Sequence, residues 1–91
     1  MRLEWTQLAF RDISEAGSYI ALDEPSAAKR MGERVHEAIE YLALQPNIGR
    51  PGRVQGTREL VISGTPFIAV YWVRGDVVQI LRLLHHARQW P

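Results

Sequence analysis

Two stretches of the chain repeat apolar residues with helical spacing. The first stripe consists of Ala9, Ile13, Ala16 and Ile20. The second consists of Ala28, Met31, Val35, Ala38 or Ile39, and Leu42. Spacings of three and four place each set on one face of an amphipathic helix. Thr6 is suited to cap the first helix, and Pro25 is suited to begin the second, which we expect to end near Gln45. The short connection predicts an antiparallel helical hairpin.

The other apolar segments have the length and composition of strands. They are residues 2–5 (RLEW), 58–63 (RELVIS), 67–73 (FIAVYWV) and 77–84 (VVQILRLL). Their β-branched and aromatic residues are favoured on a pleated surface. Between the last two, Gly75 and Asp76 predict a two-residue hairpin turn of the primed type. Residues 46–57 are rich in glycine and proline, which predicts a loop.

The element order β-α-α-β-β-β predicts an α+β fold, with the helical hairpin on one face of a small, mainly antiparallel sheet. The segment 67–73 is almost continuously apolar, which indicates a central strand covered on both faces. Two helices can cover only one face of the sheet. We therefore expect a partner, a second copy of the chain or a ligand to cover the other face.

Size and composition limit the classes of protein to consider. The chain has 91 residues, 46% of them hydrophobic, which predicts a single folded domain over residues 1–91. It has no cysteine, which excludes disulfides and thiolate metal sites and fits a reducing compartment. No apolar run is long enough to span a bilayer, and the N-terminus has no signal-peptide core. We therefore expect a cytoplasmic protein that does not bind membranes.

The net charge of +1 conceals an uneven distribution of charge. Residues 1–40 carry five basic and eight acidic residues, whereas residues 41–91 carry six arginines and two acidic residues. Arginine recognises phosphates and carboxylates through its planar fork, although codon usage can also enrich it. Arg50, Arg53 and Arg58 lie among the glycines of the loop, so they form a candidate site for phosphates or an acidic protein segment. A solvated connector without specific contacts is the alternative.

Arg82 is a cation within an apolar strand. Strict alternation places three apolar residues on its side of the sheet. These are Val78, Ile80 and Leu84. A cation in such a row needs a partner or a place at the rim, and Glu59 is a candidate partner. The functional alternative places Arg82 on an open sheet face, beside Arg58, His85 and Arg88.

His85 and His86 follow where the last strand ends. Neighbouring residues of a strand point to opposite sides, so we expect one imidazole to pack and the other to face the open side. An imidazole can transfer protons near neutral pH. The histidines lack metal-ligand spacing, and the chain contains no phosphate-binding loop and no catalytic triad. We therefore expect no metal and no cofactor.

The element order and three segments together resemble toxins of the RelE/ParE superfamily, the toxic halves of type II toxin–antitoxin modules. The segments are LALQPNIGRPGRVQGTREL, TPFIAVYWV and ILRLLHHARQW. The resemblance covers almost the whole chain. It implies a compact toxin that a cognate antitoxin wraps and holds inactive as a hetero-oligomer. Such a partner would cover the second face of the sheet.

Two activities occur in this superfamily. RelE-like members cleave mRNA in the ribosomal A site without a metal, using basic residues of the sheet, whereas ParE-like members block DNA gyrase. Where the RelE-like pattern has basic residues on the first meander strand, this chain has Glu59 and Val61. Where that pattern has an arginine in the next strand, this chain has Ile68. The resemblance to the nuclease is therefore incomplete.

The chain end is more similar to the Leu-His-x-x-Arg ending of ParE-like toxins, and Trp90 cannot donate a proton as a tyrosine does. The resemblance thus favours gyrase inhibition, with mRNA cleavage as the alternative and an inert relic or binding module as a third hypothesis. The candidate target-binding residues are Arg50, Arg53, Arg88 and Trp90. The candidate catalytic residues, for the nuclease alternative only, are Arg58, Arg82 and His85.

Overall fold

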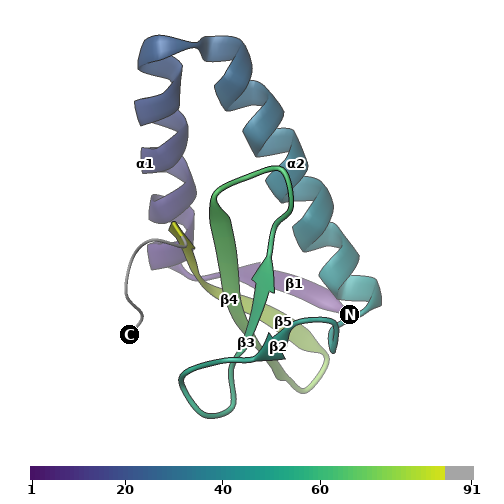
Figure 1. Ribbon diagram of the computed structural model, residues 1–91. Coiled ribbons are helices and arrows are strands. Elements are labelled where there is room, and N and C mark those ends of the chain that lie inside the picture. The colour runs from purple at the N-terminus through teal and green to yellow at the C-terminus, as the bar shows by residue number, and fades with distance from the viewer. Residues whose placement is uncertain (86–91) are drawn as a thin grey trace.

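The computed structural model describes residues 1–85 as a helical hairpin packed against one face of a five-stranded mixed sheet (Figure 1). The elements are β1 (Arg2–Trp5), α1 (Gln7–Asp23), α2 (Pro25–Leu44), β2 (Arg50–Pro51), β3 (Arg58–Val61), β4 (Phe67–Arg74) and β5 (Val77–His85). The strand order is β1-β5-β4-β3-β2, with β1 parallel to β5 and the other neighbours antiparallel. The α+β class is confirmed, and β2 is an addition within the predicted loop.

The helices begin and end close to the predicted residues because their local signals are strong. The Thr6 side-chain oxygen accepts a hydrogen bond from the Ala9 N–H at 3.0 Å, as an N-cap should. Glu24 separates the two helices, and Pro25 occupies the first turn of α2. Neither helix of the described residues combines the length and the apolar composition needed to cross a membrane.

The core lies between the hairpin and the sheet face that it covers. Its most deeply buried members are Ala9, Val35, Ile39, Leu42, Tyr71 and Ile80. The predicted helical stripes supply the helix side of this core, and alternate residues of β4 and β5 supply the sheet side. Burial of these side chains is the main favourable contribution to folding, because apolar surface leaves water.

β4 is the central strand, and its first five residues are buried. Phe67, Ala69 and Tyr71 face the helices, so Ile68 and Val70 lie on the opposite face. On that face Ile68 is 6% exposed and its neighbour Leu84 is 7% exposed. The prediction of a doubly covered central strand is confirmed at these positions. Val61, which pairs with Ile68 on the same face, is 53% exposed, so a partner on this face stays a prediction.

A β-bulge in β5 changes which of its residues face the helices. Val70 pairs with Arg82 but the next residue, Tyr71, pairs with Ile80, so Leu81 is an extra residue in β5. Leu83 consequently joins the buried core, and Arg82 lies on the opposite face. The strict alternation predicted from the sequence is wrong beyond Ile80, since one inserted residue exchanges the two faces.

The hairpin between β4 and β5 closes through Gly75 and Asp76. Gly75 has φ of 61°, a conformation that only glycine adopts without strain, and Asp76 does not have positive φ. Positive φ at the first central residue alone is the feature of a type II′ turn. The predicted primed turn is therefore confirmed.

Candidate functional site

Glu59 is a buried carboxylate at the centre of the loop arginines, and we call Glu59, Arg50 and Arg53 the loop cluster. Glu59 lies on β3 opposite Arg50 of β2, and its side chain is 3% exposed. One carboxylate oxygen accepts from Arg50 Nη2 at 3.3 Å. The other accepts from the backbone N–H of Arg53 at 3.1 Å, and Arg53 Nε lies 3.7 Å away. Two cations thus share one anion.

The rest of the loop is held by Tyr71 and Arg58. The Tyr71 hydroxyl donates to the carbonyl of Pro46 at 2.7 Å and accepts from the N–H of Gly49 at 2.9 Å. Arg58 donates to the carbonyl oxygens of Gly49 at 2.8 Å and Asn47 at 3.3 Å. Burial raises the pKa of Tyr71, while the Gly49 hydrogen bond and the Arg58 charge act in the opposite direction.

Gly49 is required by this arrangement. A Cβ at this position would lie 2.6 Å from the Tyr71 hydroxyl oxygen, closer than real contacts allow. Glycine therefore permits the backbone to approach the phenol. The loop arginines are not free in a solvated connector, because Glu59 and the carbonyl oxygens of residues 47 and 49 bind them.

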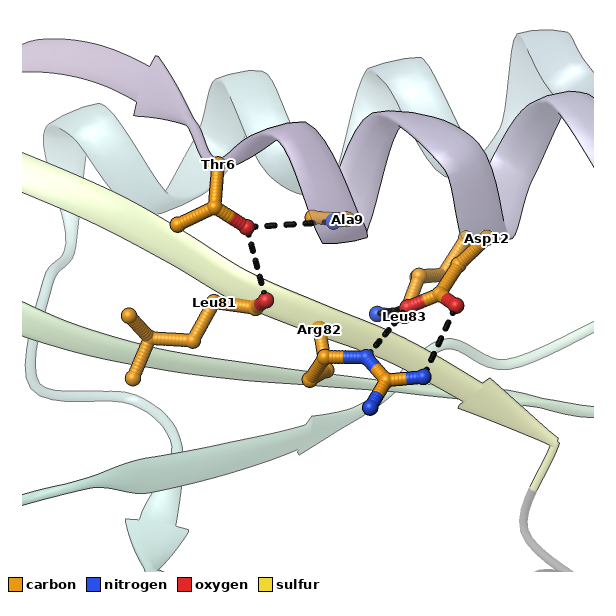
Figure 2. A network of polar contacts seen from close by, with 6 residues as sticks. All are labelled: Thr6, Ala9, Asp12, Leu81, Arg82 and Leu83. Carbon is orange, nitrogen blue, oxygen red and sulfur yellow. Dashed lines mark hydrogen bonds and ion pairs between the residues drawn. The ribbon is translucent and has the colours of Figure 1, made fainter.

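A second ion pair joins α1 to the far end of β5, and we call Asp12, Arg82 and the Leu83 N–H the edge cluster (Figure 2). Arg82 donates from Nε to Asp12 Oδ2 at 2.8 Å and from Nη2 to Asp12 Oδ1 at 3.0 Å. Asp12 Oδ2 also accepts from the Leu83 N–H at 2.9 Å. These hydrogen bonds raise the pKa of Arg82 further above its ordinary value, while burial lowers it.

The edge cluster lies where β1 ends and β5 continues. Thr6 follows β1, and its hydroxyl donates to the carbonyl of Leu81 at 2.8 Å while capping α1 (Figure 2). Asp12 then satisfies the N–H of Leu83. Two side chains of the α1 segment therefore replace the strand that is missing beside this part of β5, and Arg82 supports the arrangement by holding the Asp12 carboxylate.

The predicted Arg82–Glu59 pair is wrong, because each residue has another partner. Arg82 pairs with Asp12 and Glu59 pairs with the loop arginines. The sequence favours Glu59 as a partner because its strand is predicted to lie in the same sheet. Asp12 was not predicted, since no local pattern indicates that the first helix crosses the end of the last strand.

His85 is the last described residue and packs against β4. Its ring makes an edge-to-face contact with Phe67, with centroids 6.3 Å apart and planes at 79°. It also lines a groove between α1 and the ends of β4 and β5. His86, Arg88 and Trp90 lie outside the described residues, so the predicted roles of the chain end are not addressed by the structure.

The three nuclease candidates do not converge. Arg58 pairs with Tyr71, which faces the helices, whereas Arg82 pairs with Val70 on the opposite face of the sheet. His85 pairs with Phe67, four residues along β4 from Tyr71, a separation of about 13 Å. The structure therefore places Arg58, Arg82 and His85 in three separate surroundings. The described residues also contain no group of three carboxylates or imidazoles that could hold a metal.

Comparisons with known proteins give the family. Residues 3–90 match the model of the ParE toxin of the type II toxin–antitoxin system parDE. The chain is 44% identical over 90 residues to a protein named "Putative toxin Y4kP" from Sinorhizobium fredii, covering 99% of this chain and 93% of that protein. It is 37% identical over 84 residues to Toxin RelE2 of Caulobacter vibrioides, covering 92% and 93% of the two chains.

A solved structure agrees with these matches. The fold is similar to a chain of the chromosomal ParDE toxin–antitoxin system from P. aeruginosa, with a TM-score of 0.83 and 32% sequence identity over 93% of this chain and 95% of that chain. The helical hairpin and five-stranded sheet therefore occur in a ParDE assembly. The predicted resemblance to RelE/ParE toxins is confirmed, and the chain belongs to the ParE toxin family of type II toxin–antitoxin systems.

Proposed function

We propose that this toxin inhibits DNA gyrase and that a cognate antitoxin holds it inactive until it is released. The family match and the ParDE neighbour support a toxin with an antitoxin partner. The observation that carries the choice of gyrase is the separation of Arg58, Arg82 and His85. Both proposed targets operate in the bacterial cytoplasm, so we infer that the toxin acts there.

Metal-free cleavage of RNA needs an acid, a base and a phosphate-binding cation around one scissile bond. General acids and bases must come within about 3 Å of the proton that they transfer. Here Arg82 is engaged in a bidentate pair with Asp12, and Arg58 binds backbone carbonyls of the loop. The groove beside His85 is lined by Glu15, whose negative charge disfavours an RNA phosphate, whereas the charge of Asp12 is paired with Arg82. These features support a binding toxin over a nuclease.

The loop cluster is the proposed target-binding surface within the described residues. Arg50 and Arg53 share the single charge of Glu59, so the cluster retains one net positive charge. Their side chains are 58% and 47% exposed, which leaves the guanidinium groups accessible to a partner. A pre-organised guanidinium loses little entropy when it binds a carboxylate. We propose that Arg88 and Trp90, which lie outside the described residues, also bind the target.

One observation favours the alternative. The chain is 37% identical to a protein named Toxin RelE2. The resemblance to RelE-like toxins implies ribosome-dependent cleavage of mRNA. In that case His85 would serve as the acid or base, and Arg58 and Arg82 would bind the RNA. This alternative requires the edge cluster to release Arg82 when the toxin meets its substrate.

A brief induction of the toxin in cells separates the two activities. One half of the culture is used to map mRNA 5′ ends, and the other half to detect gyrase-linked DNA breaks. We expect DNA breaks with intact transcripts. Codon-positioned cuts in mRNA without DNA breaks would contradict gyrase inhibition and would support the nuclease alternative, in which His85→Ala should abolish the cuts.

A further inference from the structure

The two outermost strands of the sheet differ in how well they can accept a further strand. β2 lies at one end of the strand order, but it has only two residues, and Pro51 lacks a backbone N–H. β1 lies at the other end, has four residues, and contains neither a proline nor a bulge. Short length and proline prevent an outer strand from pairing with another chain, so β1 is the better suited of the two.

The backbone of Leu3 and Trp5 points away from the sheet. β1 is parallel to β5, and the Arg2 N–H donates to the carbonyl of Asp76 at 2.9 Å. This bond fixes the alternation, so residues 2 and 4 turn their backbone groups toward β5. The N–H and C=O groups of Leu3 and Trp5 therefore point the other way, where no strand of residues 1–85 lies. Such groups can pair with an added strand.

The polar side chains of β1 carry opposite charges on one face. The two apolar residues of this strand pack on the core, so Arg2 and Glu4 lie on the sheet face away from the helices. Both are exposed. Arg2 Nε lies 3.6 Å from Asp76 Oδ2, and Glu4 accepts a hydrogen bond from Gln79 at 3.0 Å. Charges of one sign would repel a second copy of the strand, but β1 carries both signs.

We propose that β1 pairs with β1 of a second copy of this chain, antiparallel, with Leu3 opposite Leu3 of the second copy. In this register Arg2 of each copy lies opposite Glu4 of the other. These positions do not exchange backbone hydrogen bonds, so their side chains approach most closely. Two ion pairs thus accompany the backbone hydrogen bonds of Leu3. A register with Leu3 opposite Trp5 would bring the two Glu4 side chains together, and their like charges disfavour it.

The size of this contact predicts a weak, reversible dimer. Two strands of four residues bury less than the roughly 1,200 Å² of a stable interface, so association depends on concentration. The dimer joins two sheets of five strands into one, with a loop cluster at each far end, because β2 and β1 lie at opposite ends of the strand order. Two loop clusters on one particle allow bivalent binding of a target. The inference goes beyond the proposed function and does not depend on which target the toxin has.

Sedimentation velocity of the purified full-length toxin measures the association. Wild type should change from monomer toward dimer between about 10 and about 500 µM. Arg2→Glu and Glu4→Arg should each weaken dimerisation by about tenfold or more, because each places like charges opposite one another. An equimolar mixture of the two variants should restore dimerisation, since each variant then meets the charges opposite to its own.

The matched control is Glu33→Arg, which makes the same charge change as Glu4→Arg at an exposed position of α2. It should dimerise within about twofold of wild type. Thermal denaturation shows whether each variant is folded. All measurements use the toxin without its target, so failure of the gyrase assignment would leave them intact.

Three results would overturn the proposal. The first is a wild-type toxin that stays monomeric at about 500 µM. The second is a mixture of the two variants that associates no more tightly than either variant alone. The third is a monomeric toxin whose binding to the cognate antitoxin is weakened by Glu4→Arg but not by Glu33→Arg, since the antitoxin would then occupy this side of β1.

Discussion

The edge cluster and the loop cluster use the same two chemical groups in different proportions. At the edge, within residues 1–85, one arginine meets one carboxylate with two hydrogen bonds of 2.8 and 3.0 Å, and the charges of these two groups cancel. In the loop, two arginines meet one carboxylate at 3.3 and 3.7 Å, and a positive charge remains. The edge arginine is 26% exposed, whereas the loop arginines are about half exposed.

The difference separates a structural arginine from arginines available for binding. Arg82 holds Asp12, which in turn satisfies the Leu83 N–H where β1 no longer borders β5. Arg50 and Arg53 hold the loop on β3 but remain accessible to another molecule. The presence of an arginine on the sheet is thus weak evidence for catalysis, and the partner of that arginine decides its role.

The largest expected effect comes from breaking the edge cluster. Asp12→Ala should lower the free energy of unfolding by about 3 kcal/mol, because it leaves a partly buried guanidinium and a buried N–H without their acceptor. Urea denaturation followed by circular dichroism measures the change. Asp12→Asn retains one acceptor and should lose less. If Asp12→Ala lowered the free energy of unfolding by less than Glu59→Ala does, the loop cluster would contribute more to stability than the edge cluster, which would contradict this account.

Glu59→Ala should lower the free energy of unfolding by about 2 kcal/mol. The Arg53 N–H loses its acceptor, and truncation of the buried side chain leaves a cavity, but both guanidinium groups can turn toward water. The same denaturation experiment measures the change. Glu59→Gln provides the control, since its amide oxygen can still accept from Arg53. If Glu59→Gln is as unstable as Glu59→Ala, the negative charge of Glu59 is essential for stability. The comparison of the loop cluster with the edge cluster must then be revised.

Tyr71→Phe tests the anchor that holds the loop beside β4. The loss of two hydrogen bonds should lower the free energy of unfolding by about 1–2 kcal/mol. Burial raises the pKa of Tyr71 in the folded state, so the unfolded chain ionises first as the pH rises through 10. The Tyr71 contribution is therefore present below pH 10 and declines above it. Denaturation at increasing pH should show the wild-type advantage over Tyr71→Phe shrinking, and a growing advantage would contradict this account.

The smallest change in stability is expected for Arg50→Gln. Glu59 retains the Arg53 backbone and side chain as partners, and exposed ion pairs contribute little. Thermal denaturation should show a shift smaller than that of Glu59→Ala. A shift as large as that of Asp12→Ala would make Arg50 a structural residue like Arg82.

Much of the fold could be predicted from local signals. Thr6 and Pro25 mark helix starts through backbone chemistry that acts within a few residues, and Gly75 marks a turn that needs positive φ. The bulge at Leu81 and the short strand β2 could not be predicted, because both depend on which strands become neighbours. A single inserted residue then reversed the predicted faces beyond Ile80.

The candidate site was predictable in composition but not in contacts. The glycine-rich loop with Arg50, Arg53 and Arg58 was visible in the sequence, and the apolar residues near Arg82 indicated that this cation needs a partner or a place at the rim. The two carboxylates that bind these arginines lie across tertiary contacts, so no spacing rule could assign Glu59 to the loop or Asp12 to Arg82. Asp12 had the appearance of an ordinary solvated helix residue.

The most direct measurement is inhibition of purified DNA gyrase supercoiling by two double variants, compared at equal concentrations of folded toxin. Arg50→Gln with Arg53→Gln removes the exposed cations, and Asp12→Asn with Arg82→Gln removes the edge pair while keeping neutral hydrogen-bonding groups. We predict that the loop variant loses inhibition by about tenfold or more and that the edge variant inhibits within about twofold of wild type. Loss of inhibition in the edge variant alone would contradict the assignment of Arg82 as structural.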